Sequence, residues 1–175
     1  ENPYNITSEE AWLLGRYLAD GYVQNGKRAG RKNSYNNKVT FCIGKKKLDE
    51  FLSNVKTYNV GLTEERTVFK TRIINKRFTE LCLMCGKGAE NKEFPSVLLN
   101  LPIELLEDAI NGYISGDGYE NNGVFNANSV SKKLTYSLGQ AVHKVYKTPV
   151  SITTTKRDKT TVIEGRTVNQ KDTWS

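Results

Sequence analysis

Two nine-residue segments of this chain, 97 positions apart, share an unusual ending. Residues 13–21 read Leu-Leu-Gly-Arg-Tyr-Leu-Ala-Asp-Gly, and residues 110–118 read Ile-Asn-Gly-Tyr-Ile-Ser-Gly-Asp-Gly. Each segment has the pattern of a helix that ends in Asp-Gly, and an acidic residue in the last turn of a helix opposes the helix dipole. Because this unfavourable charge occurs twice at matching places, we expect a positive partner, and a metal ion is the first candidate.

Small residues recur every four positions along both segments, so each expected helix has one face that another helix can approach closely. These stripes are Ala11, Gly15 and Ala19 in the first segment and Asp108, Gly112 and Gly116 in the second. The stripes coincide after a shift of 97 positions, which indicates an internal repeat. We therefore expect two halves, residues 1–101 and 102–175, joined by a helix interface that contains Ala11, Gly15 and Gly112.

Each motif helix has a start signal and is followed by strand-like and helix-like segments. Thr7-x-x-Glu10 predicts a capping box, and Pro102 is a good first-turn residue. The periodicities predict strands at 38–44, 66–74, 123–129, 150–155 and 160–168, and helices near 48–55, 76–85 and 131–146. This order predicts an α+β class with helices packed on one face of antiparallel sheets. A final helix is missing from the shorter second half, so we expect a fragment of a longer protein.

The chain is basic, with 26 Lys+Arg against 19 Asp+Glu and a formal net charge of +7. Such a balance favours nucleic acid or an anionic membrane surface as the partner. No apolar run of about 18 residues and no signal-peptide pattern occurs, so a membrane is not expected and nucleic acid is preferred.

Three cysteines, Cys42, Cys82 and Cys85, make an odd number in a chain of this size. We expect reduced, buried thiols in a cytoplasmic protein. Cys82-x-x-Cys85 could be half of a zinc site, but a second pair is missing and the single histidine, His143, is distant in sequence. We interpret the two cysteines as part of the core.

The two segments resemble the paired motifs of the LAGLIDADG homing endonucleases. The matching positions are Leu13, Gly15, Ala19, Asp20 and Gly21 in the first motif and Gly112, Ile114, Asp117 and Gly118 in the second, where Gly116 replaces the usual Ala. Residues 86–95, Gly-Lys-Gly-Ala-Glu-Asn-Lys-Glu-Phe-Pro, are similar to the lysine segment that precedes the second motif in intein-embedded members of the family. Residues 129–134 and the helix after them also resemble that type.

The resemblance implies two pseudo-symmetric αββαββα-like halves, with the motif helices at the central interface and saddle-shaped antiparallel sheets facing the DNA. It implies a divalent metal, usually Mg²⁺, and cleavage of both strands across the minor groove. Two motifs in one chain imply a monomer that binds double-stranded DNA at a long asymmetric target. The parent chain could also carry an intein splicing domain, although this chain has no Cys or Ser at position 1 and no terminal His-Asn.

Hydrolysis of a phosphodiester needs an activated water and a stabilised leaving oxygen, and metals held by carboxylates supply both. We predict that Asp20 and Asp117 are the metal ligands, helped by the carbonyls of Ala19 and Gly116, because carbonyls at helix C-termini lack helical partners. The alternative is that each Asp-Gly is only a helix stop, with Gly in the left-handed conformation.

A lysine near the scissile phosphate could polarise the water or stabilise the transition state. Lys92 matches the family's lysine in the segment before the second motif, and Lys171 is where a second-half equivalent would fall. The alternative for either lysine is a solvated surface position, which is the usual fate of Lys.

Basic residues in three regions are candidates for DNA contacts. They are Lys27, Arg28, Arg31 and Lys32 in residues 24–37, a flexible loop or the tip of a hairpin after the first motif, Lys38, Arg66, Lys70 and Arg72 on the expected first-half strands, and Arg157, Lys159 and Arg166 in the second half. The loop is suited to phosphate contacts and the strand faces to base readout in the major groove. The alternatives are a solvated charge run and ordinary sheet solubility.

These patterns leave two functions open. The first is a site-specific double-strand DNA endonuclease that uses a divalent metal. The second is a catalytically inactive nucleic-acid-binding domain of the same fold, such as a maturase or a DNA-binding regulator. The presence of both Asp20 and Asp117 favours the enzyme. A nuclease with a histidine general base is rejected, because His143 lies in an amphipathic helix without further His, Asn or Asp partners.

Overall fold

The computed structural model describes residues 1–27, 35–122, 124–163 and 166–175. The first-half elements are α1 (Ser8–Asp20), β1 (Gly21–Lys27), β2 (Tyr35–Gly44), the 3-10 turn η1 (Lys45–Lys47), α2 (Leu48–Asn54), β3 (Val60–Glu64), β4 (Val68–Ile74) and α3 (Lys76–Met84). A connection with η2 (Ala89–Asn91) and α4 (Ser96–Leu99) follows. The second-half elements are α5 (Ile103–Asp117), β5 (Gly118–Asn121), β6 (Val124–Ala127), α6 (Lys132–Tyr146), β7 (Thr154–Thr155), β8 (Thr160–Ile163), β9 (Arg166–Asn169) and β10 (Thr173–Trp174).

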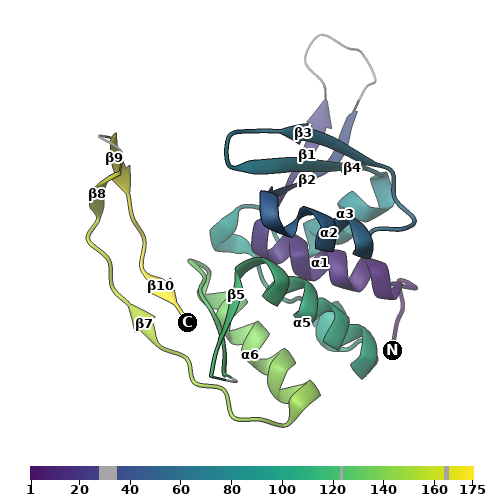
Figure 1. Ribbon diagram of the computed structural model, residues 1–175. Coiled ribbons are helices and arrows are strands. Elements are labelled where there is room, and N and C mark those ends of the chain that lie inside the picture. The colour runs from purple at the N-terminus through teal and green to yellow at the C-terminus, as the bar shows by residue number, and fades with distance from the viewer. Residues whose placement is uncertain (28–34, 123, 164–165) are drawn as a thin grey trace.

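Both motif helices form where the sequence predicts them. Thr7 and Glu10 make the predicted capping box, in which the Thr7 hydroxyl accepts from the Glu10 amide and the Glu10 carboxylate accepts from the Thr7 amide. α5 begins directly after Pro102. The two helices lie side by side and make the most extensive helix contact of the molecule (Figure 1).

The first half builds a four-stranded antiparallel sheet of order β1-β2-β4-β3. On one face Val39, Phe41 and Ile43 are fully buried, as their alternation predicts. Phe41 lies with its ring centroid 5.2 Å from that of Phe51 on α2, which joins the sheet to the helices beneath it. The other face, which we call the open face, carries Lys38, Cys42, Lys70 and Arg72, all partly exposed.

Two strands of this sheet were not predicted from residue patterns, and one predicted strand is shorter. β1 follows α1 without a break, where the sequence indicated a basic loop or the tip of a hairpin, and β3 has a largely exposed, irregular pattern. β4 begins at Val68, so the predicted strand position of Arg66 is wrong: Arg66 lies exposed in the turn after β3. The pairing of β4 with β2 continues to Gly44↔Val68 and ends there.

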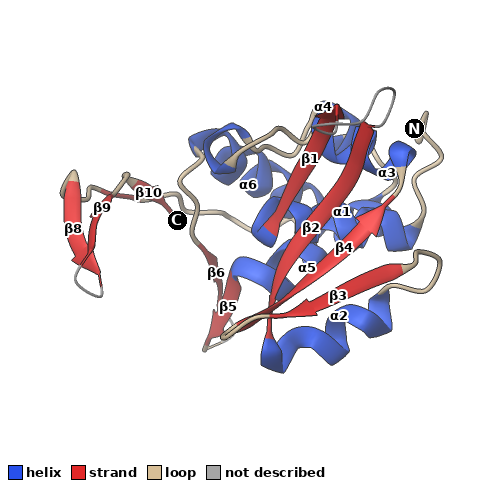
Figure 2. Cartoon of the chain, turned by 90° about the horizontal axis from the view of Figure 1, so that it is seen from above, coloured by secondary structure: helices blue, strands red, loops and turns tan. Residues whose placement is uncertain are grey.

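The second half is α+β as predicted, but its strands form separate two-stranded pairs in the described residues: β5 with β6, β7 with β10, and β8 with β9. The predicted strand 160–168 is therefore a hairpin, and the predicted strand 150–155 is reduced to β7. The reason is that alternation marks extended backbone but not the place where the chain reverses. Figures 1 and 2 show the strands after α6 as an extended arm, with the β8–β9 hairpin at its far end.

The core joins α1, α5, α3 and the covered sheet face. Cys82 and Cys85 are buried in it and all three cysteines are free thiols, so the interpretation of the Cys-x-x-Cys as core is confirmed. Within the described residues no group of three His, Cys, Asp or Glu side chains could hold a metal. No helix of the described chain is long and apolar enough to cross a bilayer.

Candidate functional site

The contact between α1 and α5, which we call the seam, depends on glycine. A Cβ atom added to Gly15 would lie 1.8 Å from the carbonyl oxygen of Ala109, and one added to Gly112 would lie 1.9 Å from that of Trp12. Each glycine therefore lets the backbone of the other helix approach closely. Ala11 is also fully buried. Ala11, Gly15 and Gly112, the residues predicted for the helix interface, thus lie in the contact between α1 and α5.

The seam brings the C-terminal ends of both motif helices together. A Cβ added to Gly116 would lie 2.4 Å from the Cβ of Ala19 and 3.1 Å from Oδ2 of Asp20. Asp20 and Asp117, the last residues of α1 and α5, thus belong to one site. The predicted convergence of the two carboxylates arises from the small-residue stripes, because larger side chains would separate the helix ends.

The two glycines after the aspartates do not stop the helices in the way the alternative interpretation supposed. Gly21 has φ −90° and Gly118 has φ −84°, both extended rather than left-handed. The chain instead enters a strand at once, and both glycines lie against the preceding helical turn: an added Cβ would lie 2.6 Å from Cδ2 of Tyr17 or 2.7 Å from the Cα of Ile114. Each Asp-Gly therefore turns a helix directly into a strand, with the carboxylate at the junction.

The two carboxylates have unequal surroundings. Asp20 is partly buried and forms an ion pair with Arg16, with 2.7 Å between Nη2 and Oδ2. Burial raises the pKa of Asp20, and the charge of Arg16 is the strongest of the opposing effects. Asp117 is accessible to solvent, yet the protein atoms around it reduce its hydration and raise its pKa, and the charge of Asp20 adds to this rise.

Lys92 is buried at the end of α1, although Lys is rarely buried. Its ammonium donates hydrogen bonds to the carbonyl oxygens of Tyr17 (2.6 Å), Leu18 (3.1 Å) and Gly21 (2.8 Å). These three acceptors use all three N–H donors, so Lys92 acts as a fixed positive charge at the negative end of the helix dipole. The solvated-surface alternative for Lys92 is therefore wrong.

Lys47 occupies the corresponding place at the end of α5. Its ammonium donates to the carbonyl oxygens of Ser115 (2.7 Å) and Gly116 (2.9 Å). The role of Lys47 has no signal in the sequence, because it is the last of three consecutive lysines before α2 and the run by itself looks like a solvated charge cluster. Its pairing with a helix from the other half could only come from the tertiary structure.

Lys171, the predicted second-half counterpart of Lys92, lies elsewhere. It is exposed and forms an ion pair with Glu90. The prediction assumed that the second half repeats the first, but the C-terminal arm forms its own strand pairs and does not bring Lys171 to the end of α5. Lys47 from the first half takes that position instead.

The donors at this site fit a hard divalent cation. Mg²⁺ is commonly held by one or two carboxylates together with water and substrate phosphates, rather than by a complete protein cage. Asp20 and Asp117 are two such carboxylates, placed so that the charge of Asp20 raises the electrostatic cost of a charge on Asp117. The carbonyl of Gly116 is a poorer candidate than predicted, because Lys47 already donates to it.

The predicted DNA-binding residues fall into separate regions. Lys38, Lys70 and Arg72 share the open face of the first sheet. Arg157 and Lys159 lie exposed on the C-terminal arm, and Arg166 begins β9. Lys27 ends β1. The side chains of Lys27 and Arg166, and all of Arg28, Arg31 and Lys32, lie outside the described residues.

Neighbouring side chains bind two of the open-face cations, Lys70 and Arg72. Lys70 forms an ion pair with Glu65 (2.7 Å), and Arg72 Nη1 donates to the Thr63 hydroxyl on β3 (2.6 Å). Such cations are suited to phosphate or base contacts on a strand that lies along DNA.

Replacing Lys70 or Arg72 on the open face should reduce the salt dependence of DNA binding. We expect Lys70→Ala and Arg72→Ala each to lower the slope of log K against log salt by about 0.9, since each lost phosphate contact releases about one counterion fewer. Lys76→Ala on α3, whose lysine pairs with Glu80 away from this face, is the matched control. Unchanged slopes for both open-face variants, measured by fluorescence anisotropy with duplex DNA, would remove this face from the binding surface.

The charge of Lys92 should give cleavage an alkaline limit. Burial lowers the pKa of Lys92 to about 8, with Asp117 and Asp20 opposing the shift. Because a lowered pKa means that the ammonium is lost as pH rises through this value, we expect kcat to fall about tenfold per pH unit above it. Lys92→Met should lower kcat and abolish the fall of kcat at alkaline pH. A wild-type rate that instead rises through the same region would identify Lys92 as a base.

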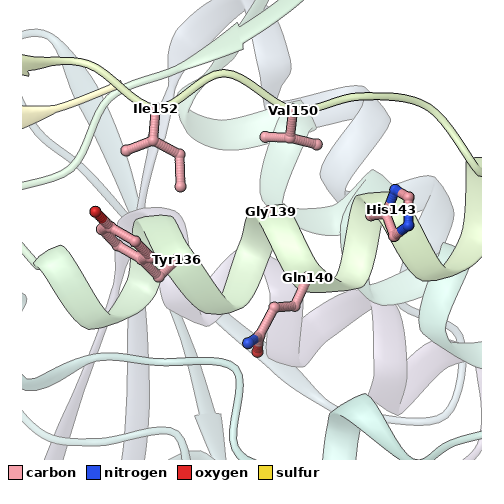
Figure 3. Close-up of a pocket in the computed structure, with 6 residues that line it drawn as sticks. All are labelled: Tyr136, Gly139, Gln140, His143, Val150 and Ile152. Atoms are coloured by element: carbon pink, nitrogen blue, oxygen red, sulfur yellow. The ribbon is translucent and has the colours of Figure 1, made fainter.

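One shallow cavity of about 330 Å³ lies between α6 and residues 150–152 (Figure 3). Its lining includes His143, Val150 and Ile152, and neither carboxylate of the seam. His143 is exposed, and its Nδ1 lies 3.0 Å from the carbonyl oxygen of Thr148. This cavity is therefore separate from the Asp20–Asp117 site.

Comparisons with known proteins agree with the geometry. No family model matches the chain. It is 27% identical over 136 residues to the DNA polymerase II large subunit of Thermococcus kodakarensis and 28% identical over 135 residues to the replication factor C small subunit of Methanocaldococcus jannaschii. These matches cover 74% and 69% of this chain but only 7% of each relative.

Two solved structures have a similar arrangement. I-DmoI in complex with DNA and Mn has a TM-score of 0.62 at 16% identity, over 88% of this chain and 85% of that one. The homing endonuclease I-WcaI bound to its DNA recognition sequence has a TM-score of 0.53 at 11% identity, over 97% and 75%. Likeness at this level of identity shows the fold alone. The chain therefore has the α/β fold, with antiparallel sheets, of the LAGLIDADG homing endonuclease I-DmoI, as its two motifs predicted.

Proposed function

We propose that this chain is a site-specific endonuclease that hydrolyses both strands of DNA with a divalent cation. The observation that carries the proposal is the meeting of Asp20 and Asp117 at the end of the glycine seam. Two like charges are brought together there at an electrostatic cost that a cation would relieve. A binding domain gains nothing from this arrangement, because carboxylates repel the DNA backbone.

In this proposal, three groups of residues have different roles. Asp20 and Asp117 are the ligands, and a divalent cation bound there would activate a water and neutralise charge on the leaving oxygen. Lys92 and Lys47 each hold a positive charge against one helix end, where it can stabilise the transition state. Lys38, Lys70 and Arg72 on the open face hold the duplex in register.

We further propose that the chain acts as a monomer on a long asymmetric target. The two halves supply different surfaces, since the four-stranded sheet of the first half has no equal among the described strands of the second. An asymmetric surface is suited to an asymmetric sequence. A stable dimer in analytical ultracentrifugation would contradict this part of the proposal.

The parent protein, in our proposal, is an intein, with this chain as its nuclease part and the cytoplasm as its location. The support is that the matched segment makes up 7% of two replication proteins with different names and functions. A mobile insert would produce this pattern, whereas a shared ancestral domain of both replication proteins would not need the aspartate pair.

Cleavage of a randomised duplex library in Mg²⁺, followed by sequencing of the cut ends, tests the function. We expect a single enriched asymmetric sequence and breaks in both strands. Selection of one sequence by binding without any breaks would support the alternative, a DNA-binding domain that does not cleave. Breaks at unrelated sequences would exclude a site-specific enzyme.

A further inference from the structure

A buried arginine lies in the seam next to one of the two carboxylates. Arg16 is 2% exposed, and its Nη2 lies 2.7 Å from Oδ2 of Asp20. Its Nη1 donates to the hydroxyl of Ser115 on α5 at 3.2 Å. Its Nε is buried and has no hydrogen-bond partner among the described residues. The guanidinium thus forms an ion pair with Asp20 and a hydrogen bond to the facing helix α5.

Packing of the seam does not require an arginine at this position. The matching residue of the second motif, 97 positions later, is Tyr113, which is buried and apolar over most of its surface. Burial of a guanidinium with an unpaired N–H is unfavourable, and it lowers the pKa of Arg16. Since an aromatic side chain fills the equivalent place, the charge of Arg16 needs a reason other than packing.

The direct contact of that charge is one-sided: Arg16 pairs with Asp20, whereas on Asp117 it acts only from a distance and less strongly than Lys92. Asp20 already has a cationic partner on its own helix. Asp117 is exposed and has no ion pair within the described part of the chain. Asp117 is the last residue of α5, directly before β5, and its side chain is accessible to solvent. The two carboxylates are therefore equivalent in sequence but not in their readiness to accept another cation.

We propose that Arg16 is a built-in counter-cation of Asp20, which makes Asp117 the ligand for the first divalent cation and imposes a fixed order on the cutting of the two strands. The part about strand order rests on the proposed endonuclease function. The part about metal uptake concerns only the side chains of the free protein. Arg16 is in this sense a positioning residue, since it acts through Asp20.

Binding of Mn²⁺ to the free protein, followed by electron paramagnetic resonance, tests the metal-uptake part without DNA. We expect Asp117→Asn to weaken Mn²⁺ binding by roughly tenfold or more, and Asp20→Asn to change it by less than about threefold. In an Arg16→Met background both aspartates should matter, and affinity should rise by about tenfold because a competing cation is gone. Equal losses for both aspartate variants in the wild-type background would overturn the proposal.

Two further variants separate charge from structure. Arg16→Lys keeps a cation four residues before Asp20. In this background Asp117→Asn should again weaken Mn²⁺ binding more than Asp20→Asn does, as in the wild type. Ser115→Ala removes the bond between Arg16 and α5, together with a bond within α5 from the Ser115 hydroxyl to the Gly112 carbonyl. It should leave Mn²⁺ binding within about twofold, because the ion pair of Arg16 with Asp20 remains. If Arg16→Lys behaves as Arg16→Met, the role of Arg16 is structural. Thermal melts establish that each variant is folded.

Strand order is read on a supercoiled plasmid that carries the selected target. At limiting Mg²⁺ the wild type should accumulate nicked circles with the break always in the same strand, and Arg16→Met should give linear product without this intermediate. Random choice of the first strand by the wild type would overturn the proposed order. If no variant cuts DNA at all, the endonuclease function fails, while the Mn²⁺ titration still decides the role of Arg16.

Discussion

Asp20→Asn and Asp117→Asn are each expected to lower double-strand cleavage by roughly 100-fold or more, because each removes a negatively charged ligand from a site with few others. Binding to the same duplex should be retained or strengthened, since the change removes negative charge near the phosphates. The measurement is cleavage of the selected target in Mg²⁺, together with an affinity measured in Ca²⁺ or without metal.

Asparagine has the shape of aspartate, but Asp20→Asn also removes the ionic partner of the buried Arg16. Thermal melts therefore have to show that each variant is folded before its cleavage rate is compared. Asp49→Asn at the exposed start of α2 is a matched control and should cleave as the wild type does. Full activity of both seam variants would rule out the assigned site. Loss of DNA binding together with cleavage would indicate instead that the aspartates organise the fold.

The second large effect concerns stability. We expect Gly15→Ala and Gly112→Ala each to lower the free energy of unfolding by about 3 kcal/mol, because the added methyl would meet a backbone carbonyl that belongs to the other motif helix. A backbone carbonyl cannot rotate away as a flexible side chain can, so relief requires the two helices to separate. Urea denaturation followed by circular dichroism measures the shift in midpoint.

Gly44→Ala is the control within the same chain. Gly44 has φ −57° and ψ 140°, which alanine adopts readily, and an added Cβ would meet nothing within 4 Å. We expect its stability to stay within about 1 kcal/mol of the wild type, with a small gain from the less flexible unfolded chain. If Gly15→Ala proves as stable as Gly44→Ala, the seam is not as tight as its backbone contacts indicate.

Separation of the helices should also affect the site, because the ends of α1 and α5 carry the two carboxylates. A seam variant that remains folded should therefore lose cleavage more than DNA binding. Lys92 and Lys47 each bridge one helix end to another segment, so they would move with the helices as well.

Local signals were sufficient for several elements of the fold. The capping box at Thr7 satisfies backbone amides within three residues, and the helix predicted over 131–146 is present as α6. The alternation of β2 describes a strand with one buried face, which is also present. Signals of this kind are local in sequence, so a single sequence is sufficient to reveal them.

Strand partners and reversals were less accessible. β1 contains Gln24, Asn25 and Gly26, which are poor strand formers, yet it pairs with β2 along its whole length. The sheet supplies the hydrogen bonds that make this segment a strand, and no local pattern reports on them. The hairpin β8–β9 was missed for the related reason that pairing decides where an extended run turns back.

The sequence by itself determined the paired motif helices, the glycine stripes that allow their contact and the two aspartates at their ends, because each depends on spacing along one helix. The Arg16–Asp20 pair is local as well, because the two residues lie four positions apart on α1. Only the tertiary structure decided which charges reach the helix ends from elsewhere in the chain: Lys92 lies at the end of α1, Lys47 lies at the end of α5, and Lys171 remains outside. Electrostatic partners depend on distance in space, and residues 68 positions apart or more meet here through the packing of two helices and a sheet.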